Sequence, residues 1–182
     1  MKKFSVTLGV AVMVLLSVSC TKTLLSLFPG FDVKVPDMQV TIPAIPIVPA
    51  DEVELGSFSM HFNLDSTIKS NTSNVFSISS VSSMKISQVQ VTLSNGNVLN
   101  NLSNFESVRI LISSSYNATE TELVNLSFPT TESYTYTSSP TNAPDILGYY
   151  YGTEIRYRLF GKLRKPTTTS LNLTMGVTLR VN

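Results

Sequence analysis

The chain has 182 residues, with 13 basic and 12 acidic side chains, one histidine and a formal net charge of +1. This near-neutral balance argues against general nucleic-acid binding, which normally needs a strongly basic face. Charged residues make up only 14% of the chain, well below the usual ~25%. The single cysteine excludes an intramolecular disulfide framework, so the fold must be stable through its core alone.

The N-terminus has the composition of a secretory signal. Lys2 and Lys3 precede an apolar stretch from Phe4 to Leu16, and small residues follow before Cys20. A charged start, a short apolar stretch and a small-residue exit predict a signal peptide over residues 1–19. The stretch is too short for a membrane span, which needs about 20 apolar residues.

The residues around the cysteine, Ser17-Val18-Ser19-Cys20, resemble a bacterial lipobox, in which the cysteine is lipidated and becomes the mature N-terminus. The usual motif has Leu three places before the cysteine, where this chain has Ser17. Relaxed lipoboxes of this kind are similar to those of small Bacteroidota-type envelope lipoproteins. The resemblance implies lipidation of Cys20, for example with palmitate, and anchoring at the outer membrane. The alternative is an ordinary cleaved signal with Cys20 as an incidental thiol.

The chain that remains after removal of the signal supports two further expectations. The remaining 163 residues carry 11 basic and 12 acidic side chains, a formal charge of −1, and their number predicts a single domain. Thr21, Lys22 and Thr23 lack the acidic cluster that accompanies surface export in such lipoproteins. The resemblance therefore favours the periplasmic side of the outer membrane over the cell surface.

Residues 20–50 contain five of the nine prolines. Proline lacks an N–H for a ladder hydrogen bond, so this stretch cannot be a helix or a central strand. It is predicted first as an extended tether. The same stretch from Val33 to Val48 is also rich in Val and Ile, and we expect part of it, residues 39–48, to lie along the domain as an edge strand.

From residue 55 the apolar residues recur with a period of two, which predicts β-strands. The first runs from Phe58 to Leu64, and residues 75–81 form a weaker candidate. Between residues 84 and 93 the apolar parity changes near Ser87, which predicts a bulge. The pair Asn95-Gly96 then signals a tight turn. Further strands are expected over 108–112, 124–128 and 134–136, with one helical turn over 142–147.

The C-terminal region shows the clearest alternation. Residues 155–163 and 171–181 each place apolar side chains at every second position, with a turn around Pro166 between them, and this predicts a hairpin. Six to nine short strands, each with one apolar face, predict an all-β antiparallel sandwich over residues 51–182, Ig-like or a related two-sheet architecture. A closed barrel is the competing architecture.

Catalytic and metal-binding patterns are absent from the sequence. His61, the only histidine, has the parity of an exposed strand position, and no serine lies in a nucleophile-elbow motif. One histidine and one cysteine cannot make a zinc site, and no calcium loop is present. The acidic residues Asp51, Glu52 and Glu54 are interpreted as a solvated turn. We expect no enzyme, no cofactor and no metal.

Three surface features are candidates for contact. Arg156, Arg158, Lys162 and Arg164 share one strand face and form a basic stripe around Phe160, suited to an anionic partner such as lipid headgroups, lipopolysaccharide or an acidic glycan. The structural alternative is a solvated outer face whose positive charges discourage edge-to-edge pairing and could pair with Glu106, Glu120, Glu122 and Glu132. The other two features are the aromatic run Tyr149, Tyr150 and Tyr151, and the sequence Asp65-Ser66-Thr67, which resembles an O-glycosylation motif of Bacteroidota-type exported proteins with Ser66 as acceptor.

Together these features predict a membrane-anchored, non-enzymatic envelope lipoprotein that serves as a binding, adhesion or accessory module for a protein or glycan. The alternative is a structural subunit or anchor of a pilus-like surface assembly, in which the segment Val33–Val48 takes part in strand addition. An envelope hydrolase is the remote third option.

Overall fold

Alternating apolar and polar residues form the long strand β9 (Leu171–Val181) in the computed structural model, which describes residues 28–182. One edge of β9 pairs first with β2 and then with β1, and the other edge pairs with β4, which also pairs with β7. These strands form sheet A: β1 (Phe31–Lys34), β2 (Met38–Ile42), β4 (Met84–Leu93), β7 (Thr135–Ser138) and β9.

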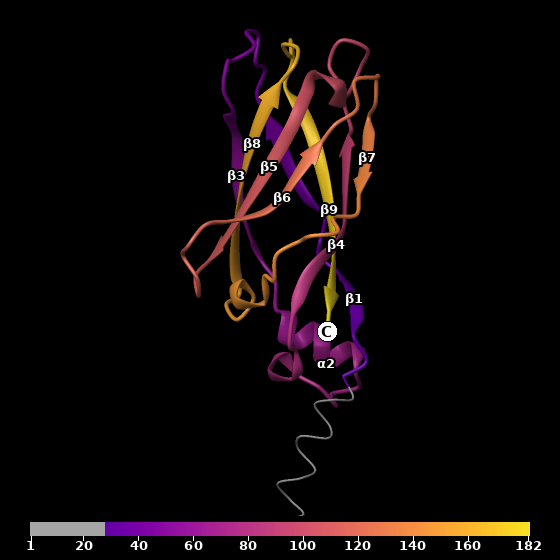
Figure 1. Ribbon diagram of the computed structural model, residues 1–182, viewed down its shortest axis with the longest axis vertical. Helices are drawn as coiled ribbons and strands as arrows, with labels where there is room; N and C mark the ends of the chain where they lie inside the picture. The colour runs from indigo at the N-terminus through magenta and orange to yellow at the C-terminus, as the bar shows by residue number, and fades with distance from the viewer. Residues whose placement is uncertain (1–27) are drawn as a thin grey trace, which may run out of the picture.

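A second antiparallel sheet packs against the first (Figure 1). Its strand order is β3-β8-β5-β6, and every neighbouring pair is antiparallel. The members of sheet B are β3 (Val53–His61), β5 (Phe105–Ser114), β6 (Thr121–Ser127) and β8 (Glu154–Leu163). Because the two sheets are separate, the chain is a sandwich and not a closed barrel.

The pairing follows a simple rule. Strand β2 pairs with β9, β3 with β8, β4 with β7 and β5 with β6, so the chain is one long hairpin that folds over into two sheets. This is the arrangement of a jelly roll. The prediction of an all-β antiparallel sandwich is confirmed, in the two-sheet form related to, but different in strand order from, an immunoglobulin domain.

The core lies between the sheets, and the long strands β4, β5, β8 and β9 contribute to it mainly through every second residue. All apolar positions of the alternation in β9 are buried, and Tyr157 and Phe105 are the largest side chains among the most deeply buried residues. The parity change in β4 is confirmed as a bulge, because the register with β9 shifts between Ile86 and Gln88. A second bulge in β3 lies at Gly56, whose φ of 155° is readily adopted only by glycine.

The N-terminal segment of the described chain is part of sheet A. The side chains of Val33, Val35 and Ile42 are buried, at 2%, 0% and 0% exposure. The prolines lie where the ladder is interrupted: Pro36 separates β1 from β2, and Pro43 follows β2. Residues 31–42 therefore belong to the sandwich instead of a free tether, and the edge strand starts before residue 39 and ends before Val48.

A helix that the sequence analysis did not predict follows β3, and a predicted weak strand after it is a 3₁₀ turn. The alternation of β3 ends at His61, and Asn63 caps helix α2 (Leu64–Asn71) by accepting a hydrogen bond from the backbone N–H of Ser66 at 3.0 Å. The weaker strand expected over residues 75–81 is wrong. Ser73 and Asn74 have positive φ, and the chain then makes the short 3₁₀ turn η1 (Ile78–Ser80).

The predicted C-terminal hairpin is also wrong, although both of its strands are present. Strand β8 lies in sheet B and β9 in sheet A, so residues 164–170 cross between the sheets at the top of the molecule in Figure 1. Residues 94–104 cross in the same way from β4 to β5, so Asn95-Gly96 does not close a hairpin. Alternation shows which face of a strand is buried but does not identify its neighbour.

Two further 3₁₀ turns occur in the connections. The turn η2 (Leu102–Asn104) precedes β5, and η3 (Leu147–Tyr149) lies between β7 and β8. The helical turn expected over residues 142–147 therefore starts later than predicted. Asp145 explains the shift, because its carboxylate accepts hydrogen bonds from the backbone N–H of Leu147 and of Met84, both at 3.0 Å.

Two isoleucines of the N-terminal segment provide a matched test of its role. Ile42 is fully buried, whereas Ile47, five residues later, is 79% exposed. We expect Ile42→Ala to lower the free energy of unfolding by about 2–5 kcal/mol, and Ile47→Ala to change it by less than about 0.5 kcal/mol. Urea denaturation of the two variants measures the difference. Equal effects would contradict the assignment of this segment to sheet A.

Candidate binding site

The outer face of sheet B carries a groove that we call the sheet-B groove. It has a volume of about 650 Å³. Its lining comes from β3, β5, β8 and the β5–β6 loop: Ser57, Phe58, Ser59, Ser113, Ala118, Glu120, Arg156, Tyr157 and Arg158.

Strand register explains why a groove forms there. Ser59 on β3 and Ser113 on β5 both lie opposite Arg156 on β8, one on each side. Directly opposed residues on neighbouring strands point to the same face. Two short side chains therefore flank one long side chain, and the floor of the groove is lined with hydroxyl groups.

Most of the predicted basic stripe is neutralised within the chain. Arg158 donates to Glu54 from Nη2 at 2.7 Å and to both carboxylate oxygens of Glu120 from Nη1 at 3.1 Å. The hydrogen bond from Arg158 lowers the pKa of Glu54. Lys162 forms an ion pair with Glu106 at 3.2 Å. The alternative interpretation of a charge-paired face therefore holds for these two cations.

Arg164 and Arg109 are also occupied. Arg164 donates to three backbone carbonyls, including that of Phe105 at 2.6 Å, and thereby ties β8 to the chain around β5 and β6. Arg109, on β5, pairs with Glu52 at 2.7 Å. The guanidinium groups of Arg109 and Arg158 lie 5.0 and 4.9 Å from the ring centre of Phe160. Glu52 and Glu54 are thus ion-pair partners and not merely a solvated turn.

Arg156 differs from the other arginines of this face. Its Nε donates to Glu154 at 3.1 Å, and no hydrogen bond of its two terminal nitrogens is found within residues 28–182. Its side chain is 61% exposed. Among the basic residues of the predicted stripe, Arg156 therefore retains the most capacity for an external ligand.

The three consecutive tyrosines separate into two environments. Tyr149 and Tyr150 are buried at 7% and 2% exposure, whereas Tyr151 is 48% exposed. The hydroxyl groups of Tyr150 and Tyr157 lie 3.0 Å apart within the core, and Tyr149 bonds to Thr121 at 2.6 Å. Burial raises the pKa of Tyr157 to about 12 and raises that of Tyr150 well above its usual value.

An exposed aromatic pair adjoins the groove. The ring of Tyr151 lies 5.5 Å from the ring of Tyr116, which is 68% exposed. Tyr116 belongs to the β5–β6 loop, which also supplies Ala118 and Glu120 to the groove. This loop and the turn before β8 lie at the lower left of Figure 1. Sequence patterns did not identify Tyr116, because it is a single aromatic residue in a polar loop.

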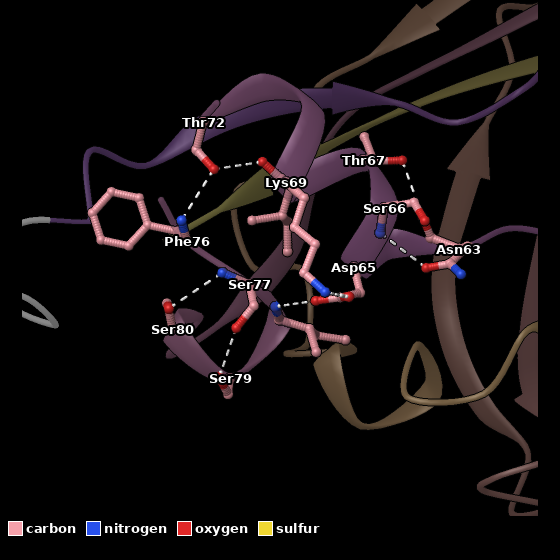
Figure 2. Close-up of polar contacts among 12 residues, drawn as sticks. Asn63, Asp65, Ser66, Thr67, Lys69, Thr72, Phe76, Ser77, Ser79 and Ser80 are labelled. Atoms are coloured by element: carbon pink, nitrogen blue, oxygen red, sulfur yellow. Dashed lines mark hydrogen bonds and ion pairs between the residues drawn. The ribbon is translucent and has the colours of Figure 1, made fainter. Parts of the chain in front are cut away.

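The predicted glycosylation residue Ser66 lies in the first turn of α2 and is exposed (Figure 2). Its neighbour Asp65 accepts hydrogen bonds from Lys69 and from the backbone N–H of Ile78, and these bonds lower the pKa of Asp65. This network fixes the helix to η1. Glycosylation of Ser66 stays a prediction.

The remaining sequence candidates are placed as follows. Cys20 and the lipobox-like residues lie outside the described chain. His61 is exposed, as expected, and no group of residues suited to hold a metal occurs within residues 28–182. In the same range, no helix has the length and apolar character needed to cross a membrane.

A second surface, missed at the sequence level, lies at the opposite end of the sandwich. Val98, Leu99 and Ile47 are each more than 70% exposed on loops that join the sheets. Buried amides join the loop of Val98 and Leu99 to residues 164–170: Asn100 accepts from the Thr168 backbone N–H at 2.7 Å, and Asn104 donates to the Pro166 carbonyl at 2.7 Å. The adjacent pair Val98-Leu99 within an Asn-rich loop was the available signal.

The chain matches no protein-family model and no curated protein sequence. Among solved structures it is similar to the family 32 carbohydrate-binding module of C. perfringens NanJ in complex with galactose, at 10% identity, covering 81% of this chain and 99% of that one with a TM-score of 0.37. It is also similar to the Drosophila NLP core, at 11% identity, 81% and 97% coverage and a TM-score of 0.28. At these identities and TM-scores, the likenesses assign no ligand.

The buried tyrosine pair predicts a pH effect on stability. An unfolded tyrosine ionises near pH 10, whereas Tyr157 in the folded chain has a pKa of about 12 and that of Tyr150 is well above 10. The stabilisation is fully present below about pH 10 and is lost as the pH rises toward about 12. We expect the free energy of unfolding to fall over that window.

Urea denaturation at several alkaline pH values measures this fall. The double variant Tyr150→Phe/Tyr157→Phe should reduce the pH dependence, whereas Tyr116→Phe, at an exposed position, should leave it unchanged. A pH dependence that is the same in all three proteins would contradict the assignment.

Proposed function

We propose that this chain is a non-enzymatic binding module of the bacterial cell envelope, which is held at the outer membrane by a lipid on Cys20 and binds a glycan in the sheet-B groove. The observation that carries the proposal is the arrangement around Arg156. An arginine with open donors stands between two serines, and an exposed tyrosine pair adjoins the groove that they line.

The chemistry of the groove suits a sugar. A sugar ring presents hydroxyl groups at its edge and C–H groups on its faces, so it needs both hydrogen-bonding partners and a flat apolar surface. Ser57, Ser59 and Ser113 supply hydroxyls, and none of them makes a side-chain hydrogen bond within residues 28–182. Tyr116 and Tyr151 supply flat aromatic faces with polar tips.

Several observations support binding in preference to catalysis. A serine nucleophile needs a hydrogen-bonded base, and no hydrogen bond joins His61 to any serine within the described residues. The acidic residue of the groove, Glu120, is already paired with Arg158. The groove thus offers contacts that hold a ligand without an activated group that would attack it.

The alternative of a pilus-like subunit has less support. Strand addition needs either an open sheet edge or a free strand. The segment Val33–Val48, proposed for this role, already contributes β1 and β2 to the edge of β9. Releasing these strands would expose buried side chains such as Val33 and Ile42.

The anchor is tested on the full-length chain in a bacterial host. We expect the mature N-terminus to be Cys20 with attached acyl chains, and Cys20→Ser to lose the lipid and to leave the membrane fraction. Mass spectrometry of the N-terminal peptide and membrane fractionation measure both effects. Cleavage elsewhere, or a membrane-bound Cys20→Ser protein, would contradict the anchor.

The groove is tested by filling it with a large side chain. Ser59 is exposed on the edge strand β3, so Ser59→Trp should block the groove without disturbing the core. Thr137→Trp is the matched control, because Thr137 is exposed on β7, an edge strand of the other sheet. We expect the wild type and the control to bind members of an oligosaccharide array, and Ser59→Trp to lose at least about tenfold in affinity, a factor that corresponds to 1.4 kcal/mol.

Circular dichroism and thermal unfolding confirm that both tryptophan variants are folded. If Ser59→Trp binds the array as well as Thr137→Trp does, the groove is not the binding site. If no oligosaccharide binds the wild type, the glycan-binding proposal fails.

A further inference from the structure

We infer that the ligand of the sheet-B groove bears a carboxylate and that the two terminal nitrogens of Arg156 bind it. This inference rests on the proposed function and names the class of glycan: a saccharide that contains a uronic acid or another carboxylated sugar. It concerns a single arginine, in contrast to the four-residue basic stripe that the sequence predicts.

Comparison with the neighbouring Arg158 shows that Arg156 lacks a second carboxylate partner. A guanidinium group has two edges that each match a carboxylate. In Arg158 one edge, Nε and Nη2, holds Glu54, and the other side, Nη1, holds Glu120. In Arg156, as far as residues 28–182 are concerned, only Nε is engaged, by Glu154. The two side chains stand two residues apart on the same face of β8, so they share an environment and differ in one missing carboxylate.

Within the described chain, no carboxylate binds the two terminal nitrogens of Arg156. On β3, the residue paired with Arg156 is Ser59, and on β5 it is Ser113. Of the glutamates on this face, Glu54 and Glu120 pair with Arg158 and Glu52 pairs with Arg109. Glu122, on the far strand β6, interacts electrostatically with Arg109. The open nitrogens therefore face short hydroxyl side chains and the space of the groove.

The surrounding charges favour a singly charged, planar anion. Glu154 pairs with Nε of Arg156, and Glu120 lines the same groove; both would repel a doubly charged phosphate more than a carboxylate. A carboxylate matches the planar fork of the guanidinium, and Ser59 and Ser113 can donate to its outer lone pairs. The tyrosine pair, of which Tyr116 lies on the loop that supplies Ala118 and Glu120 to the groove, offers an aromatic face for further parts of the saccharide.

The experiment compares matched ligands. The ligands are trisaccharides of uronic acids, each measured beside its methyl ester, which keeps the sugar and removes the charge. The proteins are the mature chain, its Arg156→Gln, Arg156→Lys and Ser59→Trp variants, and an Arg180→Gln control. Arg180 is an exposed arginine of sheet A that pairs with Asp32. Isothermal titration calorimetry at low and high salt gives the affinities.

We expect the wild type and Arg180→Gln to bind at least one acid about tenfold more tightly than its ester, with the preference weakened by salt. Arg156→Gln should bind the acid and the ester equally and keep the affinity for the ester. Arg156→Lys should restore only part of the preference, because an ammonium keeps the charge but lacks the fork.

Each other outcome overturns the inference. If esters bind as tightly as acids and Ser59→Trp abolishes both, glycan binding in the groove stands and the carboxylate assignment fails. If the preference for acids survives in Arg156→Gln, another residue binds the charge. If no acid or ester binds, or if Ser59→Trp changes nothing, the inference fails together with the proposed site.

Discussion

The fold depends on the pairing of β9 along both of its edges. With one cysteine in the sequence, no disulfide joins the two sheets, and stability must come from the core between them. Strand β9 contributes a buried side chain at every second position, and its two edges are closed by β1 and β2 on one side and by β4 on the other. The N-terminal segment is therefore needed to cover the same core that the last strand fills.

A consequence is that sheet A and sheet B present different outer faces. Sheet A has β9 at its centre, and the outward positions of this strand are mainly Thr and Asn. Sheet B has β8 near its centre, with arginine or lysine at most outward positions. The cations of β8 form ion pairs with glutamates from β3, β5 and the β5–β6 loop, and Arg109 on β5 pairs with Glu52. Surface ion pairs add little stability individually, and their main effect here is that, within residues 28–182, Arg156 is the arginine of β8 whose two terminal nitrogens have no partner.

Much of this was predictable from the sequence, and the exceptions have a common cause. Apolar alternation identified the long strands, their buried faces and the bulge near Ser87. It failed on the apparent hairpin of β8 and β9, because alternation does not specify the partner strand. The same holds for the candidate site: the sequence predicted which face its side chains occupy but not which residues they contact. The parity of β8 placed the arginines on one face, but the partners of Arg158 lie 104 and 38 residues away in the chain. The capped helix after Asn63 was a missed local signal.

The position of β1 also limits how far from the membrane a domain anchored through Cys20 would lie. Phe31 pairs with Val181, so the chain enters the sandwich beside its C-terminal end, at the bottom of Figure 1. Ten residues lie between Cys20 and Phe31, and even a fully extended chain over these eleven steps spans at most about 40 Å. With a lipid on Cys20, the domain would stay close to the bilayer. The aromatic pair lies toward this same end, so the groove would bind glycans near the membrane surface instead of distant ones.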